Sequence, residues 1–236
     1  MGGGKDILSS LLVAVFPKRC GFCGKVITPS ADACGDCNKI VSRVQPPVCI
    51  LCGRGKEECM CKDHQCFYSR LAAPFYYEDT VRKCIWNFKF RGKTQNAKIL
   101  ANEMAITAEK EFSGKKFDII TCVPLTKISL KNRGYNQGWL LAKEIGTLLN
   151  IDTVDGLLKK LYDTPAQHTM NSSMRRGNLV GVFDVIKPEM ISGRRILLCD
   201  DVATTGATLN ECAKMMVLYG AKEVCCLTAA VTRKAK

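Results

Sequence analysis

The chain has 236 residues, of which 47% are hydrophobic and 24% are charged, and its formal net charge is +13. This length suits one medium domain plus a small one, and the composition is that of a soluble globular protein. Because no apolar run approaches the roughly 18 to 20 residues that cross a bilayer, we expect no membrane insertion, and the basic charge favours anionic partners.

The apolar stretch at residues 7–16 predicts a short amphipathic helix at the start of the chain. Basic residues follow it, where a cleaved signal peptide would need small ones, so we interpret it as part of the folded protein. The 15 cysteines are either in close pairs or in apolar segments. Reduced thiols and metal sites fit this placement better than a disulfide scaffold, which predicts a cytoplasmic protein.

Eight cysteines between residues 20 and 61 have the spacing of metal ligands. Two Cys-x-x-Cys pairs separated by ten residues suit one tetrahedral zinc ion, and a third pair with a Cys-x-Cys suggests a second site, for which His64 or Cys66 is an alternative ligand. The predicted ligands are Cys20, Cys23, Cys34 and Cys37 in the first site and Cys49, Cys52, Cys59 and Cys61 in the second. With so few apolar residues, this region should need one or two structural zinc ions to fold.

The composition changes near residue 70, which predicts a cysteine-rich module over residues 1–70 and a larger domain over 71–236. In the larger domain, buried strands alternate with helices. We expect helices at 98–112 and 135–149, strands at 117–123, 196–199 and 224–231, and a helix between the last two strands that ends near Gly220. Such alternation indicates an α/β fold with a mostly parallel sheet, and in such sheets ligands bind beyond the carboxyl ends of the strands.

Residues 200–208 follow one of these strands and read Asp-Asp-Val-Ala-Thr-Thr-Gly-Ala-Thr. A short loop into a helix leaves amide groups free for a phosphate, and the loop's glycine permits close approach. Asp200 and Asp201 would repel a phosphate alone, but they can accept hydrogen bonds from the 2- and 3-hydroxyls of a ribose 5-phosphate. The alternative is a helix cap and turn with no ligand. The candidate phosphate-binding residues are Ala203, Thr204, Thr205, Gly206, Ala207 and Thr208.

This segment resembles the signature of the type I phosphoribosyltransferases, in which a hydrophobic strand leads through two acidic and two apolar residues into Thr-Thr-Gly-x-Thr. The resemblance implies a Rossmann-like parallel sheet flanked by helices. It also implies phosphoribosyl pyrophosphate and Mg²⁺ as ligands, and a reaction that displaces pyrophosphate from the anomeric carbon. Asp200 and Asp201 would then be the catalytic acidic pair.

Further motifs resemble one branch of these enzymes, the ComF family. Arg133, Gly134, Asn136 and Gln137 match its Arg-Gly-Tyr-Asn-Gln motif, which we expect to open a helix and to bind pyrophosphate oxygens. The alternative is that Asn136 only caps that helix and that Arg133 is solvated. Gln167 and Arg175 match polar residues that the family has farther along, in a segment that either closes over the active site or is an ordinary surface loop. The paired cysteines resemble the double zinc ribbon found before ComF domains.

The most basic stretch, residues 82–98, contains Trp86, Phe88 and Phe90 among its cations and has no acidic neighbour between residues 80 and 102. Aromatic rings among cations are typical of surfaces that bind single-stranded nucleic acid. The alternative is that the rings pack into the sheet and only the cations reach water.

The ComF resemblance implies a link to single-stranded DNA uptake during natural transformation and to the DNA-uptake machinery. Three functions therefore compete: a phosphoribosyl pyrophosphate-dependent transferase, a nucleic-acid-handling protein, and a non-catalytic phosphoribosyl sensor. No residue pattern identifies a nucleobase or amine acceptor.

Overall fold

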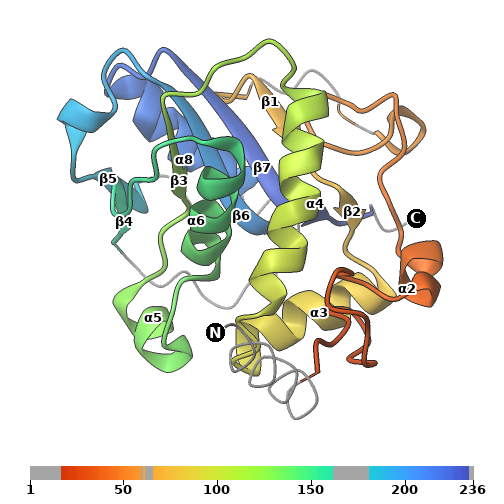
Figure 1. The fold of residues 1–236 in the computed structure, drawn as a ribbon. Helices are drawn as coiled ribbons and strands as arrows, with labels where there is room; N and C mark the ends of the chain where they lie inside the picture. The colour runs from red at the N-terminus through yellow and green to blue at the C-terminus, as the bar shows by residue number, and fades with distance from the viewer. Residues whose placement is uncertain (1–16, 60, 62–65, 162–180, 234–236) are drawn as a thin grey trace, which may run out of the picture.

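The computed structural model of the chain describes residues 17–59, 61, 66–161 and 181–233 (Figure 1). The expected helix at 7–16 and the alternative zinc ligand His64 lie outside these residues. Within the described part of the chain, every helix is too short or too polar to span a lipid bilayer.

In chain order, the first elements are α2 (Gly35–Ile40), η1 (Lys56–Glu58), β1 (Arg70–Ala72), β2 (Phe75–Tyr76), α3 (Asp79–Phe90), α4 (Asn96–Glu111), β3 (Ile119–Cys122) and α5 (Lys127–Arg133). They are followed by α6 (Gln137–Leu149), β4 (Leu158–Lys160), β5 (Phe183–Val185), η3 (Pro188–Met190), β6 (Arg195–Ala203), α8 (Ala207–Leu218) and β7 (Glu223–Val231). The helices expected at 98–112 and 135–149 correspond to α4 and α6, and the helix expected to end near Gly220 corresponds to α8.

The main sheet has the strand order β1-β7-β6-β3, and β2 pairs with the far end of β7. Every strand pair in this sheet is parallel. The central pair, β6 and β7, runs in register from Arg195 opposite Glu223 to Ala203 opposite Val231. The predicted mostly parallel sheet is therefore confirmed, and β4 and β5 form a separate antiparallel pair.

Helices cover both faces of the sheet because alternate strand residues are apolar on both sides. In β6, Leu197 and Cys199 belong to the core under α3, α4 and α6, whereas Ile196 and Leu198 belong to the core under α8. Figure 1 shows α4 and α6 in front of the strands and α8 behind them. The cysteines in the strands act here as small core side chains, as expected.

The cysteine-rich region packs along one side of this body through polar links to α4. The guanidinium of Arg43 donates two hydrogen bonds to the Glu103 carboxylate, at 2.5 and 2.7 Å. The amide of Asn102 donates to Asp32 at 2.6 Å. The module is thus held against the helix that covers the front of the sheet.

One close approach inside the larger domain gives a test of the packing. A Cβ added to Gly146 of α6 would lie 2.2 Å from Cγ2 of Thr153 and 2.8 Å from the carbonyl oxygen of Ile151. We expect Gly146→Ala to lower the free energy of unfolding by about 1–3 kcal/mol, because backbone must move to admit the methyl group. Urea denaturation measures this. Gly35→Ala, where the added atom meets open space, is the matched control, and equal unfolding midpoints for the two variants would contradict the packing.

Candidate phosphoribosyl site and zinc clusters

Strand β6 extends farther than the apolar run predicted. Its backbone stays paired with β7 through Asp200 opposite Thr228 and Ala203 opposite Val231. Both acidic residues therefore belong to the strand, and the loop consists only of residues 204–206. The prediction of one continuous loop over 200–208 was wrong because the ladder with β7 continues past the last strongly apolar residue, Cys199.

The loop ends at the start of α8, where the N-cap residue is a glycine and so offers no side-chain hydrogen bond to the first amides of the helix. Gly206 is the N-cap of α8 with a φ of 76°, a left-handed conformation that favours glycine. The Thr205 hydroxyl accepts a hydrogen bond from the Ala207 amide at 3.3 Å. The first turn of a twelve-residue helix thus faces a loop that also carries Thr204 and Thr205, both exposed. Its amides and positive dipole end suit a phosphate group.

A lysine from a distant helix pairs with the second acidic residue. Nζ of Lys89, in α3, lies 2.7 Å from Oδ1 of Asp201, a residue only 3% exposed. Burial by itself lowers the pKa of Lys89, but the charges of Asp201 and Asp200 raise it above its ordinary value. The lysine is therefore protonated and forms an ion pair with the Asp201 carboxylate. The other oxygen of that carboxylate, Oδ2, is buried and has no hydrogen-bond partner in the described residues.

The first acidic residue has an unusual protonation equilibrium. Burial and the negative charge of Asp201 raise the pKa of Asp200 to about 7. Lys89, Arg133 and the Asp201 amide, which donates to Oδ1 of Asp200 at 2.8 Å, oppose this rise. Asp200 is thus poised to change charge near neutral pH, and a ligand that presents hydroxyl groups would favour the ionised form.

Arg133 ends one helix where we expected it to open the next. It is the last residue of α5, and Gly134 stops that helix with a φ of 82°. The Arg133 guanidinium lies 5.2 Å from the centroid of the Phe90 ring. Its charge lowers the pKa of Asp200, although burial and Asp201 raise that pKa more, so Arg133 contributes to the electrostatic field at the acidic pair.

Asn136, in contrast, is the helix cap that we gave as the alternative. Its Oδ1 accepts from the amide of Gly138 at 2.9 Å, and its Nδ2 donates to the carbonyl of Val123 at 3.0 Å. The side chain thereby fixes the start of α6 to the end of β3. Gln137 is buried beside it, and its Oε1 has no hydrogen-bond partner among the described residues. The two other predicted site residues, Gln167 and Arg175, lie outside the described residues.

Lys89 was missed as a site residue by the sequence analysis, which placed it only in a basic stretch. One signal was present. Helix α3 buries Val81, Cys84, Ile85 and Phe88, and Lys89 follows Ile85 by four residues, so it lies beside the apolar face. A lysine at such a position needs an anionic partner, but helical spacing does not say that the partner is Asp201.

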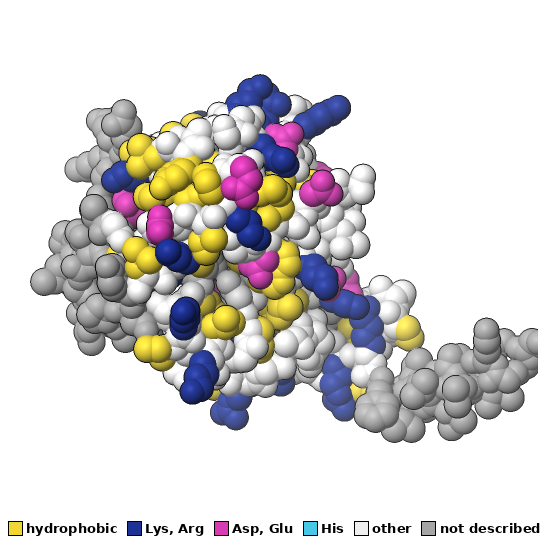
Figure 2. All heavy atoms as spheres, turned by 90° about the vertical axis from the view of Figure 1, so that its left-hand side faces the viewer, with side chains coloured by type: hydrophobic (Ala, Val, Ile, Leu, Met, Phe, Trp, Pro, Cys, Tyr) yellow, Lys and Arg dark blue, Asp and Glu magenta, His cyan; other side chains and the backbone are white. Residues whose placement is uncertain are grey.

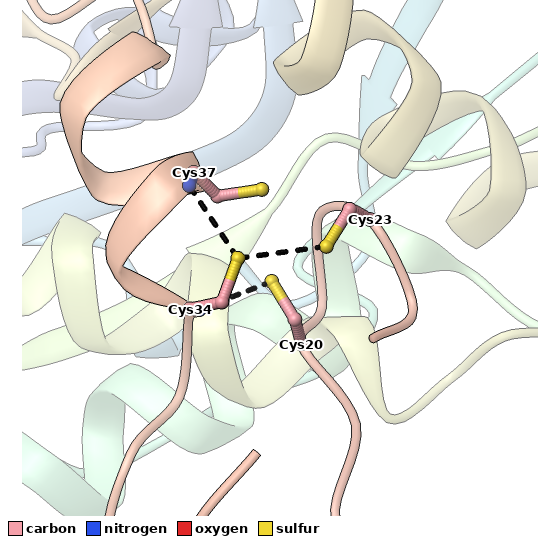
Figure 3. Close-up of side chains that lie close together, drawn as sticks. All are labelled: Cys20, Cys23, Cys34 and Cys37. Carbon is pink, nitrogen blue, oxygen red and sulfur yellow. Dashed lines mark hydrogen bonds between the residues drawn. The ribbon is translucent and has the colours of Figure 1, made fainter. Parts of the chain in front are cut away.

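The four cysteines of the first pair of motifs converge on one point. Their sulfur atoms all lie within 4.8 Å of one another, and Figure 3 shows them turned toward a common centre, with Cys34 and Cys37 at the start of α2. Sγ of Cys23 lies 3.6 Å from Sγ of Cys34, close to the spacing of about 3.8 Å that tetrahedral Zn–S bonds require. Although burial raises the pKa of the Cys20 thiol, backbone hydrogen bonds hold it at about 6, which favours the thiolate that binds metal.

The second cluster consists of Cys49, Cys52, Cys59 and Cys61, whose sulfurs also lie within 4.8 Å of one another. The unusual Cys-x-Cys pair is therefore part of the site, and Cys66 is not. Backbone hydrogen bonds and the neighbouring thiols lower the pKa of Cys49 to about 7 against the effect of burial. Both donor sets fit a structural zinc ion.

Known families match both parts of the chain. Residues 11–68 match the double zinc ribbon domain, and residues 135–236 match the phosphoribosyl transferase domain. Competence protein F of Haemophilus influenzae is 27% identical over 87% of this chain and 81% of its own length. Competence protein ComFC of Bacillus subtilis is 24% identical over 83% of this chain and 82% of its own length. The chain therefore combines these two domains and is similar to curated competence proteins over most of its length.

Among solved structures, the allosteric regulatory enzyme of purine biosynthesis aligns with a TM-score of 0.40 and 18% identity. The alignment spans 61% of this chain and 30% of that enzyme. The fold of this chain is shown instead by its own parallel sheet and by the two domain matches.

The buried ion pair gives a second test. Lys89→Gln leaves Asp201 buried with no cation beside it, so we expect the free energy of unfolding to fall by roughly 3 kcal/mol. The double variant Lys89→Gln/Asp201→Asn removes both charges and should recover most of that loss. Urea denaturation of the four proteins of this cycle measures the coupling between the two side chains. If Lys89→Gln and the double variant lose the same free energy of unfolding, the ion pair between Lys89 and Asp201 does not stabilise the fold in this way.

Proposed function

We propose that this chain is a ComF protein, that it binds phosphoribosyl pyrophosphate with Mg²⁺ at the end of β6, and that it handles single-stranded DNA during natural transformation in the cytoplasm. One observation carries the first half: an acidic pair near the carboxyl end of a parallel strand is followed, after the loop at residues 204–206, by a helix start whose amides suit a phosphate group. The names of the relatives, competence protein F and ComFC, support the second half.

Each part of the ligand has a chemical counterpart in this arrangement. Asp200 and Asp201 would accept hydrogen bonds from the two ribose hydroxyls, and Lys89 holds the Asp201 carboxylate by an ion pair. The start of α8 would hold the 5-phosphate with Thr204, Thr205 and Thr208. Arg133 would contact the pyrophosphate, with Gln167 and Arg175 as further candidates.

Magnesium suits the oxygen donors of this site. The unpaired Oδ2 of Asp201 and the carboxylate of Asp200 are hard ligands of the kind that Mg²⁺ prefers, usually with retained water. When bound, the ion would neutralise charge on the pyrophosphate. The contribution of the chain is to hold the ribose, to position the phosphate and to supply cations near the leaving group.

The first prediction for this site is a pH-dependent affinity. The pKa of Asp200 is about 7 against an ordinary value of 3.8, so its ionisation costs free energy in the folded, unliganded protein. The free energy of unfolding therefore falls as pH rises from about 4 through 7. A diol ligand favours the ionised form. We therefore expect the Kd for phosphoribosyl pyrophosphate, measured by calorimetry with Mg²⁺, to fall as pH rises from about 6 to about 8.

The control for that measurement is the Kd of the variant Asp200→Asn over the same pH range. Any pH dependence that remains in this variant comes from titration of the ligand's own phosphates. Asp152→Asn, at an exposed aspartate, should behave like the wild type. No binding by the wild type, or an unchanged Kd in Asp200→Asn, would refute the site. Pyrophosphate release with and without single-stranded DNA then separates a transferase from a sensor, because a sensor binds without turnover.

An exposed aromatic and cationic surface supports the nucleic-acid function. Trp86 and Phe90 are 43% and 57% exposed, and their ring centroids lie 5.9 Å apart. Arg91 lies over the first ring at 5.1 Å and Arg133 over the second at 5.2 Å. Of the three rings, only Phe88 is packed into the core, so the alternative in which the rings pack inward is wrong for Trp86 and Phe90.

Charge on the neighbouring surface has the same sign. Residues 124–137, which include α5, contain Lys127, Lys131 and Arg133 and no acidic residue. Figure 2 shows basic side chains at the lower end of one face, the end where α5 lies in Figure 1, whereas acidic side chains appear higher on that face. Stacking of bases on the two rings, with phosphates on the surrounding cations, is the binding mode that fits this surface.

We expect Trp86→Ala to weaken binding of a fluorescent single-stranded oligonucleotide by about tenfold or more, because base stacking on an aromatic ring contributes about 1–3 kcal/mol. Fluorescence anisotropy at fixed salt measures this. Phe67→Ala is the matched control, since Phe67 is 44% exposed and has Lys214 over its ring at 5.7 Å, outside this surface. Equal losses in both variants, or none in Trp86→Ala, would contradict the assignment.

A further inference from the structure

The second zinc ribbon directly contacts the loop between β6 and α8, residues 204–206. Arg54 follows the knuckle formed by Cys49 and Cys52, and its side chain extends into the larger domain. Its Nε donates to the carbonyl of Thr232 at 2.7 Å, and its Nη2 donates to the carbonyl of Thr204 at 2.8 Å. Thr204 is the first residue of the loop, so one guanidinium joins the ribbon to the residues just after β6 and β7.

A second contact reaches the other end of the loop. The hydroxyl of Tyr68 donates to the carbonyl of Leu51, inside the knuckle, at 2.7 Å. The same oxygen lies 3.1 Å from the position that a Cβ on Gly206 would occupy. Tyr68 therefore fills the space between the knuckle and the last residue of the loop, and the ribbon supports the loop at both ends.

The first ribbon has a basic residue at the same position but uses it differently. In both ribbons a glycine with positive φ follows the second cysteine, Gly24 at 79° and Gly53 at 68°, and a cation comes next. In the first ribbon that cation is Lys25, which pairs with Asp36 of its own ribbon at 2.9 Å. The link to the loop is thus specific to the second ribbon.

Arg54 can hold the loop only while its own backbone is held. The knuckle is tied to the body by the Leu71 amide, which donates to the carbonyl of Ile50 at 2.8 Å, and by the Gly55 amide, which donates to the Tyr76 hydroxyl at 3.0 Å. The cysteines of the second cluster close this segment on itself. A small module of this kind depends on its metal to fold, so loss of zinc should release Arg54 from the loop.

We propose that Arg54 is a positioning residue through which the metal-bound second ribbon holds residues 204–206 in the conformation that binds a phosphate group. Zinc at the second cluster and a phosphoribosyl ligand then stabilise each other, since coupling between two binding sites is reciprocal. The part of this inference that concerns the ligand rests on the proposed function. The part that concerns the loop does not.

The loop is tested first without any ligand. We expect Arg54→Gln to increase amide hydrogen exchange at residues 203–207 by about tenfold, because a charged hydrogen bond to the loop is lost. Lys25→Gln, at the equivalent position of the first ribbon, should leave this exchange unchanged, and Arg54→Lys should restore it only in part. All three variants must retain the zinc content of the wild type, measured by elemental analysis, which excludes collapse of the ribbon.

The linkage is tested on the same proteins. Phosphoribosyl pyrophosphate with Mg²⁺ should slow the release of zinc to a chelator from the second cluster and not from the first. Hydrogen exchange in residues 49–59 reports on the second cluster, and exchange in residues 20–37 reports on the first. In Arg54→Gln this slowing should vanish, and the Kd for phosphoribosyl pyrophosphate should rise about tenfold.

The outcomes separate the inference from the proposed function. If the wild type binds no phosphoribosyl pyrophosphate while loop exchange still responds to Arg54→Gln, the proposed ligand is wrong and the positioning role stands. If loop exchange and Kd are unchanged in zinc-loaded Arg54→Gln, or if Lys25→Gln has the same effect, the positioning role is refuted.

Discussion

The parallel ladder between β6 and β7 is the constraint on which the site depends. It carries β6 beyond its apolar run, so that Asp200 and Asp201 are held by strand hydrogen bonds and not by a flexible turn. Because the ladder ends at Ala203, the chain must turn within three residues to enter α8, and Gly206 supplies the left-handed conformation for that turn. The same ladder brings the end of β7, with Thr232, beside the loop, where its amide donates to the carbonyl of Ala203.

Holding two carboxylates at a buried strand end has an electrostatic cost, and the surrounding cations offset it unequally. Lys89 pairs with Asp201, whereas Asp200 has no ion pair of its own in the described residues and keeps a raised pKa. The site is thereby prepared for a neutral, hydroxyl-bearing group next to an anionic one. A ligand with only phosphates would meet both negative charges, and one with only hydroxyls would leave the start of α8 unused.

The zinc ribbons differ in what they do for the rest of the protein. The first cluster packs beside α4 through Asp32 and Asn102, and its own basic residue, Lys25, stays within the ribbon. The second has Arg54 at the corresponding place, and its hydrogen bonds end on backbone carbonyls of the larger domain. Because these acceptors are backbone carbonyls, Arg54 fixes the position of the loop backbone and no further charged side chain is needed there. A module with two cysteine clusters is thus joined directly to the loop between β6 and α8.

The sequence by itself determined the elements whose cause is local. Alternating apolar strands and helices predicted the parallel sheet, paired cysteines predicted both metal clusters, and the run from Asp200 to Thr208 marked the segment where we propose that the ligand binds. Tertiary structure decided the partners: that β6 continues to Ala203, that Asn136 caps α6, and that Trp86 and Phe90 face outward while Phe88 faces inward. It also brought Lys89 to Asp201 and Arg54 to Thr204, across 112 and 150 positions of sequence. Periodicity and spacing report on neighbours within one element, whereas an ion pair or a hydrogen bond between elements depends on how the whole chain packs, and no local pattern encodes that.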